Sequence, residues 1–126
     1  MRDVKFLICK HCGNLIQVIH DAKVPMLCCG EKMVELIPNT VDASGEKHLP
    51  AVAMDGNVCK VSVGTVAHPM LPEHHIQWVY LQTELGGQMQ YLNPGDAPEV
   101  SFVLGSDKPV AVYAYCNLHG LWKVAL

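Results

Sequence analysis

The six cysteines are spread unevenly along the 126 residues, and this constrains the fold more than any other feature of the sequence. Four of them lie within the first 29 residues: Cys9, Cys12, Cys28 and Cys29. The other two, Cys59 and Cys116, lie in the remaining part of the chain. A region this short cannot fold on a hydrophobic core alone and needs crosslinks or a metal ion. Because Pro38-Asn39 has turn chemistry, we expect a small domain at residues 1–37 and a second domain at residues 38–126.

Composition and charge narrow the choice between disulfides and metal ligation. The N-terminus is charged and lacks an apolar run ending in a cleavage site, so we expect a cytoplasmic location, where thiols stay reduced. Metal-bound thiolates are therefore favoured over disulfides. No apolar run reaches the roughly 18 residues of a membrane span. The net charge of −3 and the lack of a basic block argue against nucleic acid as a partner.

The first four cysteines have the spacing of a metal site with sulfur ligands only. Cys9-x-x-Cys12 is followed by Gly13, which permits a tight turn, and the adjacent Cys28 and Cys29 supply a second pair. Adjacent side chains of an extended chain point apart, so binding by both must strain the backbone there. A structural zinc, an iron or a pair of disulfides all remain open on spacing alone, and His11 within the first pair is more often solvated than a ligand.

The second part of the chain has the pattern of a β-sandwich. Cys59, Val61 and Val63 alternate with Val58, Lys60 and Ser62. Gly86-Gly87 is typical of a hairpin turn, and short β-rich runs recur between turns. The fold class is therefore mainly β. No amphipathic helix is evident, although residues 28–36 could form one helical turn.

Histidines cluster at the turns of this second part, together with one cysteine. Four histidines and the cysteine of a C-x-x-H pair give five donors, more than the four of a structural zinc site: His48, His68, His74, His119 and Cys116. Iron accepts imidazole together with thiolate, and a sixth position would stay open for catalysis. A blue-copper site is the alternative, but no methionine follows His119 closely.

The sequence resembles the desulfoferrodoxin family of two-iron superoxide reductases over nearly the whole chain. In the first part the resemblance rests on Cys9–Asn14 and Cys28–Glu31, which are similar to the desulforedoxin module. In the second part it rests on four further segments in the same order: Glu46–Pro50, Val63–Met70, Leu92–Pro98 and Tyr115–Gly120. Each segment alone is modest evidence, and together they are specific.

The resemblance implies a desulforedoxin-like iron domain with four cysteine ligands, followed by an immunoglobulin-like superoxide reductase domain. It implies one iron on Cys9, Cys12, Cys28 and Cys29, with zinc as the alternative there. It implies a second iron with four equatorial imidazoles and an axial thiolate: His48, His68, His74, His119 and Cys116. It also implies a homodimer, and rubredoxin or a similar protein as electron donor in the detoxification of superoxide.

Two further residues are implied to act in catalysis. Lys47 is expected to attract superoxide and help to deliver protons, and Glu46 resembles the glutamate that fills the vacant position of the ferric iron. The residue after the third histidine is often aromatic in the family and is His75 here. Cys59 is expected to be a buried, inert thiol. The rival interpretations are an electron-transfer protein with a saturated second site and a structural or storage protein with zinc in both sites.

Overall fold

The computed structural model describes residues 3–126. The chain divides into two compact units, Met1–Ile37 and Pro38–Leu126. Each unit is mainly β. The first contains a three-stranded antiparallel sheet in the order β2-β1-β5 and a two-stranded hairpin, β3-β4. Its strands are short: β1 (Phe6–Ile8), β2 (Leu15–Gln17), β3 (Leu27–Cys28), β4 (Glu31–Lys32) and β5 (Val34–Glu35).

The expected helical turn at residues 28–36 is wrong, because this segment forms the β3-β4 hairpin and β5. Cys28 pairs with Glu31, so Cys29 and Gly30 alone make the turn. Both have positive φ, 53° and 76°, as a two-residue turn of type I′ requires. A non-glycine residue at positive φ carries local strain, which agrees with the strain expected from two adjacent metal-facing cysteines.

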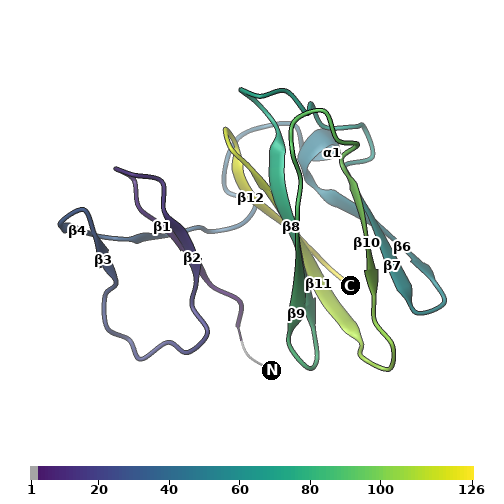
Figure 1. Ribbon diagram of the computed structural model, residues 1–126, viewed down its shortest axis with the longest axis horizontal. Helices are drawn as coiled ribbons and strands as arrows, with labels where there is room; N and C mark the ends of the chain where they lie inside the picture. Colours follow the sequence, from purple (N-terminus) through teal and green to yellow (C-terminus); the bar gives the residue numbers. More distant parts are fainter. Residues whose placement is uncertain (1–2) are drawn as a thin grey trace. The chain divides into compact units, whose positions relative to one another are not determined.

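The second unit is a sandwich of two antiparallel sheets, ordered β10-β7-β6 and β12-β11-β8-β9 (Figure 1). This confirms the mainly β fold class with an immunoglobulin-like sandwich. The strands of the smaller sheet are β6 (Pro50–Asp55), β7 (Val58–Val63) and β10 (Glu99–Val103). Those of the larger sheet are β8 (Ile76–Thr83), β9 (Gly87–Tyr91), β11 (Pro109–Cys116) and β12 (Gly120–Ala125).

The core of the second unit lies between the inward faces of the two sheets. Alternate residues of β7 point inward, as the sequence pattern predicts: Cys59, Val61 and Val63 are at most 1% exposed. Facing positions come from β8, β10 and β11, and Phe102 is the largest side chain of the sandwich that is completely buried. Cys116 belongs to the same core, so one donor of the expected metal site lies at the end of a buried strand.

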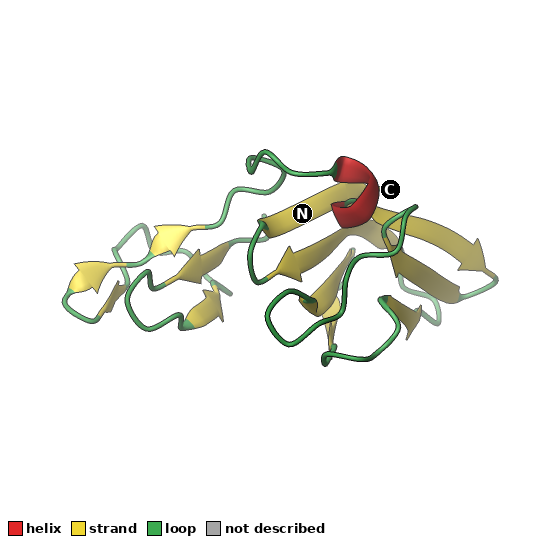
Figure 2. Ribbon diagram, turned by 90° about the horizontal axis from the view of Figure 1, so that it is seen from above, coloured by secondary structure: helices red, strands yellow, loops and turns green. Residues whose placement is uncertain are grey.

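One short helix, α1 (Gly45–His48), lies at one end of the sandwich, opposite the β6-β7 turn (Figures 1 and 2). Its last residue, His48, is buried, whereas Glu46 and Lys47 are exposed. Within residues 3–126 no helix has the length and apolar character needed to cross a membrane.

Candidate metal centres

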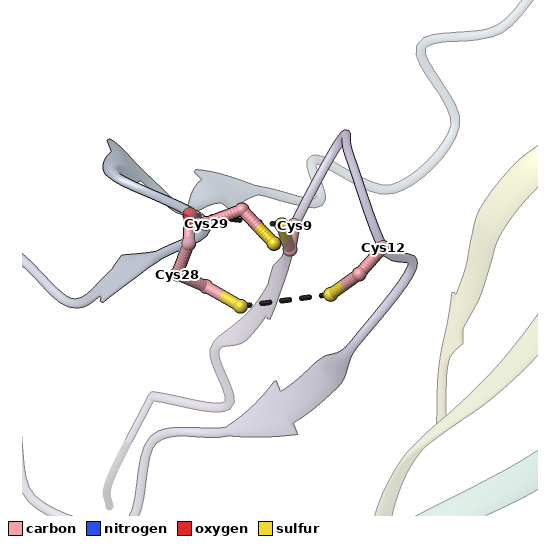
Figure 3. A group of neighbouring side chains, drawn as sticks. All are labelled: Cys9, Cys12, Cys28 and Cys29. Atoms are coloured by element: carbon pink, nitrogen blue, oxygen red, sulfur yellow. Dashed lines mark hydrogen bonds between the residues drawn. The ribbon is translucent and has the colours of Figure 1, made fainter.

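The four cysteines of the first unit converge at the turns of two hairpin-like segments (Figure 3). Their sulfur atoms all lie within 4.8 Å of one another, and Cys12 Sγ is 3.6 Å from Cys28 Sγ. That separation is far beyond a disulfide bond, and it matches the edge of a tetrahedron of sulfurs about 2.3 Å from a central ion. All four thiols are free. Cys9 is buried, while Cys12 and Cys29 are exposed, so the cluster lies at the surface of its unit.

Local backbone geometry aims hydrogen-bond donors at these sulfurs. Gly13 has φ 83° and closes the turn through its N–H to the Cys9 carbonyl at 2.9 Å. The N–H groups of Cys12 and His11 donate to Cys9 Sγ and lower the pKa of that thiol to about 6. Contacts with Cys12 and the other sulfurs raise the pKa of Cys29 to about 12. The Cys9 thiol therefore ionises easily, whereas the Cys29 thiol resists ionisation. All four groups can be thiolates together only when a cation lies between them.

Four imidazoles form a square at the α1 end of the second unit. Going round the square from His48 to His68, His74, His119 and back, ring centroids are 4.6, 4.7, 5.1 and 4.9 Å apart, and neighbouring rings are nearly perpendicular, at 77° to 84°. The His48 and His74 rings face each other across the diagonal at 6.5 Å. Four rings arranged edge to face around a point are what an ion with four equatorial imidazoles requires.

The protonation pattern of these rings fits a bound cation. His48 Nδ1 donates to the Ser44 carbonyl at 2.6 Å and His68 Nδ1 to the Pro69 carbonyl at 2.7 Å, since a carbonyl can only accept. Burial lowers the pKa of His48, and that of His68 to about 4, so both rings are neutral. Their bare Nε2 atoms nevertheless face each other at 3.1 Å, the spacing of two ligands about 2.1 Å from one metal ion at a right angle.

His74 and His119 complete this set of acceptors. His74 Nε2 is buried and has no hydrogen-bond partner within the described part of the chain. His119 turns its Nδ1 toward the centre, 3.1 Å from His48 Nε2. An orphaned acceptor, with other acceptors close by, is unfavourable unless a cation lies among them, so the residues fit a metal ion.

Cys116 ends β11 on one side of the square. Its sulfur lies within 4.8 Å of donor atoms of His48, His68 and His74, and 3.9 Å from His119 Nδ1. Burial raises the pKa of the thiol, while N–H groups of His119 and Leu118 donate to the sulfur and oppose that rise. Two backbone N–H donors are therefore placed to tune the sulfur.

The remaining residues singled out in the sequence fall into two groups. Lys47 and Glu46 are exposed on α1 directly before His48. Burial is the main cause that lowers the pKa of His74 and His48, and the positive charge of Lys47 makes a smaller contribution in the same direction. His75 lies next to His74 and its Nδ1 is also buried without a partner in residues 3–126. Cys59 is wholly buried in the core and belongs to neither cluster, as expected for an inert thiol.

Three residues that hold the site together were missed by sequence reasoning. Trp122 stacks on His48 at 4.9 Å and donates its Nε1–H to the His119 carbonyl at 3.1 Å. Gly64 lies against α1, where a Cβ atom would come within 2.6 Å of the Glu46 carbonyl oxygen. Asn117 bonds to the segment that carries His74. Gly64 and Asn117 lie inside the motif segments, but a motif does not say what such a residue touches.

The chain therefore has two candidate metal centres with different donors. One offers thiolates alone, and the other offers imidazoles with one thiolate. This defines the class of protein as a metalloprotein with two distinct metal centres. The comparison with known families agrees with this class, since the Desulfoferrodoxin model matches residues 40–125. The chain belongs to the desulfoferrodoxin family.

Individual relatives support this membership, two of them over nearly the whole chain. A desulfoferrodoxin of Nitratidesulfovibrio vulgaris is 45% identical over 115 residues, covering 91% of this chain and 90% of that protein. The crystal structure of the superoxide reductase from Treponema pallidum has a TM-score of 0.83 at 40% identity, covering 98% of this chain and 99% of the other. The one-iron superoxide reductase of Giardia intestinalis has a TM-score of 0.55 at 30% identity, covering 64% of this chain and 97% of its own.

Proposed function

We propose that this chain is a superoxide reductase, which reduces superoxide to hydrogen peroxide at an iron held by His48, His68, His74, His119 and Cys116. The observation that carries the proposal is the square of four imidazoles with the Cys116 sulfur on one side. Five donors leave the sixth position of an octahedral ion free for a small ligand. A ferrous ion bound there would supply one electron and that vacant position.

The charges of the site favour an anionic substrate. Neutral imidazoles add no charge and one thiolate adds −1, so a divalent ion keeps a net positive charge of about one. Lys47 adds a second positive charge, which is felt at His74 and His48. Both charges attract superoxide, and in our proposal Lys47 Nζ also passes protons through solvent to the reduced oxygen. Two protons and one electron convert each superoxide to hydrogen peroxide.

Cys116 and Glu46 have separate proposed roles. The Cys116 thiolate would donate electron density to a bound iron, as thiolates do in haem enzymes, and the two N–H donors would moderate that donation. The exposed carboxylate of Glu46, two residues before His48, would serve as a further ligand for iron in its oxidised state.

We further propose iron rather than zinc in the four-cysteine centre, and a small electron-transfer protein such as rubredoxin as the external reductant. The exposure of Cys12 and Cys29 supports electron exchange at that centre, since both sulfurs lie at the surface. A homodimer is proposed from the resemblance alone.

The test is a metal analysis with visible spectra of the purified protein, before and after ascorbate or ferricyanide, followed by a superoxide consumption assay. Two irons per chain, two thiolate-to-iron bands that bleach separately and stoichiometric peroxide are the expected result. One zinc and one iron would keep the reductase and remove the electron relay. A colourless zinc protein, obtained from cells supplied with iron, would overturn the proposal.

A further inference from the structure

The side chain of Asn117 bonds to the backbone on both sides of His74. Asn117 Oδ1 accepts from the backbone N–H of His75 at 2.9 Å, and Asn117 Nδ2 donates to the Glu73 carbonyl at 2.9 Å. The backbone N–H of Asn117 also donates to the His75 carbonyl at 3.3 Å. The side-chain amide of Asn117 thus forms a hydrogen bond with a backbone group on each side of His74, as a neighbouring β-strand would.

His74 depends on such a support more than the other ligand candidates do. His48 and His68 are each held by a ring Nδ1 bond to a carbonyl of their own segment, and both are 2% exposed. Within residues 3–126 His74 makes no ring bond of this kind. It lies on a turn closed by paired backbone bonds between Leu71 and His74, at 2.9 and 3.1 Å, and Leu71 and Glu73 are exposed. This turn has little buried surface of its own to fix it.

Asn117 lies between the two donors of the C-x-x-H loop, one residue after Cys116 and two before His119. Its bonds therefore join the turn carrying His74 directly to the loop carrying the thiolate, across 42 residues of sequence. We infer that Asn117 is a positioning residue, which sets the place of His74 in the imidazole square relative to Cys116 and His119. The inference rests on the proposed metal site and adds to it a residue that no donor pattern identifies.

The direct test is Asn117→Ala in the full chain, with the affinity of the histidine centre for Fe²⁺ measured by competition with a chelator. Residues that orient metal ligands typically change metal affinity by about 10- to 100-fold when they are removed. We expect a loss of that size, together with a shifted thiolate-to-iron band of the histidine centre. The four-cysteine centre lies in the other unit and serves as an internal reference, so its band should not change.

Asn39 provides a matched control, because it makes the same amide fork elsewhere. Asn39 Nδ2 donates to the Lys123 carbonyl at 3.0 Å, and its Oδ1 accepts from the Lys123 N–H at 2.8 Å. Asn39→Ala removes equivalent hydrogen bonds from Lys123, which is not a candidate metal ligand. It should lower the melting temperature and leave Fe²⁺ affinity within about twofold of the unaltered protein.

A second variant, Asn117→Asp, keeps the Oδ1 acceptor for His75 and loses the donor to Glu73, so its affinity should fall between those of the unaltered protein and Asn117→Ala. It also decides the matter if the alanine variant does not fold. Unchanged affinity and an unchanged band in either Asn117 variant would overturn the inference. A protein that binds iron but does not consume superoxide would refute the proposed function alone, since the affinity comparison does not require turnover.

Discussion

At the scale of single residues, the histidine centre combines groups that differ in what they can exchange with solvent. His48, His68 and Cys116 are almost completely buried, and they would hold a bound ion through donors anchored in the fold. Lys47 and Glu46 are exposed and contribute charge without being anchored in the core. Substitutions at the buried donors should therefore remove the centre, whereas substitutions at the exposed pair should change only the rates at which it works.

For Lys47 the expected effect is on capture of the anion. Lys47→Ala should lower the second-order rate constant with superoxide by about 10-fold, because a nearby positive charge accelerates association. The rate constant of the variant should also depend less on ionic strength, because the variant lacks a positive charge that salt would screen. Stopped-flow or pulse-radiolysis measurements at several salt concentrations check this. Lys60, which pairs with Asp55 at 3.2 Å near the opposite end of the sandwich, supplies the control variant Lys60→Ala.

Two completely buried thiols allow the role of Cys116 to be separated from general stability. Cys116→Ser should abolish the thiolate-to-iron band of the histidine centre, because a hydroxyl is not a thiolate donor. Cys59→Ser places a hydroxyl in the core and should destabilise the fold by about 1–3 kcal/mol without changing that band. Visible spectra and thermal melts of both variants check this. A surviving band in Cys116→Ser would contradict the proposed ligand set.

At the scale of elements, the histidine centre is assembled from segments that pack against one another at one end of the sandwich. The loop after β7 accommodates α1: the Val66 N–H donates to the Glu46 carbonyl at 2.9 Å, and Thr65 Oγ1 donates to the same oxygen at 3.2 Å. The loop carries His68 and the helix carries His48, so this contact sets the distance between two of the imidazoles.

At Gly64 the backbone of this loop comes close to the backbone of the α1 segment. A Cβ atom there would lie 2.6 Å from the Glu46 carbonyl oxygen and 2.8 Å from that of Leu49, and backbone atoms cannot move aside cheaply. Gly64→Ala should therefore displace α1 and lower Fe²⁺ affinity by about 10-fold or more. Chelator competition measures this. The control is Gly56→Ala in the β6-β7 turn, where a Cβ meets nothing within 4 Å and only the positive φ is strained. Equal affinities in the two variants would refute this role of Gly64.

Sequence pattern predicted the sandwich well and the small unit less well. Alternation identified the buried face of β7, and Gly86-Gly87 identified the β8-β9 turn, because both signals are local. The helical turn at residues 28–36 was wrong because a two-residue turn with Cys29 at positive φ overrides local propensity there. The donors could be predicted because their residue types are rare and their spacings are distinctive. The contacts of Trp122, Gly64 and Asn117 depend on how loops distant in sequence meet, which no local pattern encodes.

At the scale of the whole molecule, the two units rest on different sources of stability. The sandwich has a continuous apolar core between two sheets, from Cys59 to Cys116. In the described part of the first unit only Phe6, Leu7 and Cys9 are buried apolar residues. The first unit should therefore depend on its metal ion for folding, and the sandwich should not.

A chain that begins at Pro38 should consequently fold and keep the histidine centre with its reaction toward superoxide. The one-iron superoxide reductase of Giardia intestinalis, which matches 64% of this chain over 97% of its own, supports this expectation. The truncated chain should lack the band of the four-cysteine centre. Circular dichroism, metal content and the superoxide assay check this, and loss of the fold would show that the sandwich depends on the first unit.

The stack of Trp122 on His48 also gives the protein an optical reporter of its own. An indole 4.9 Å from an imidazole of the centre lies within reach of quenching by an open-shell metal ion. The chain has only one other tryptophan, Trp78, which stacks on Tyr115 at 5.4 Å. Emission recorded from Trp78→Phe should therefore fall as iron enters the histidine centre, and emission from Trp122→Phe should respond far less. Loading of that single centre could then be followed in time, in a protein that has a second candidate metal centre elsewhere.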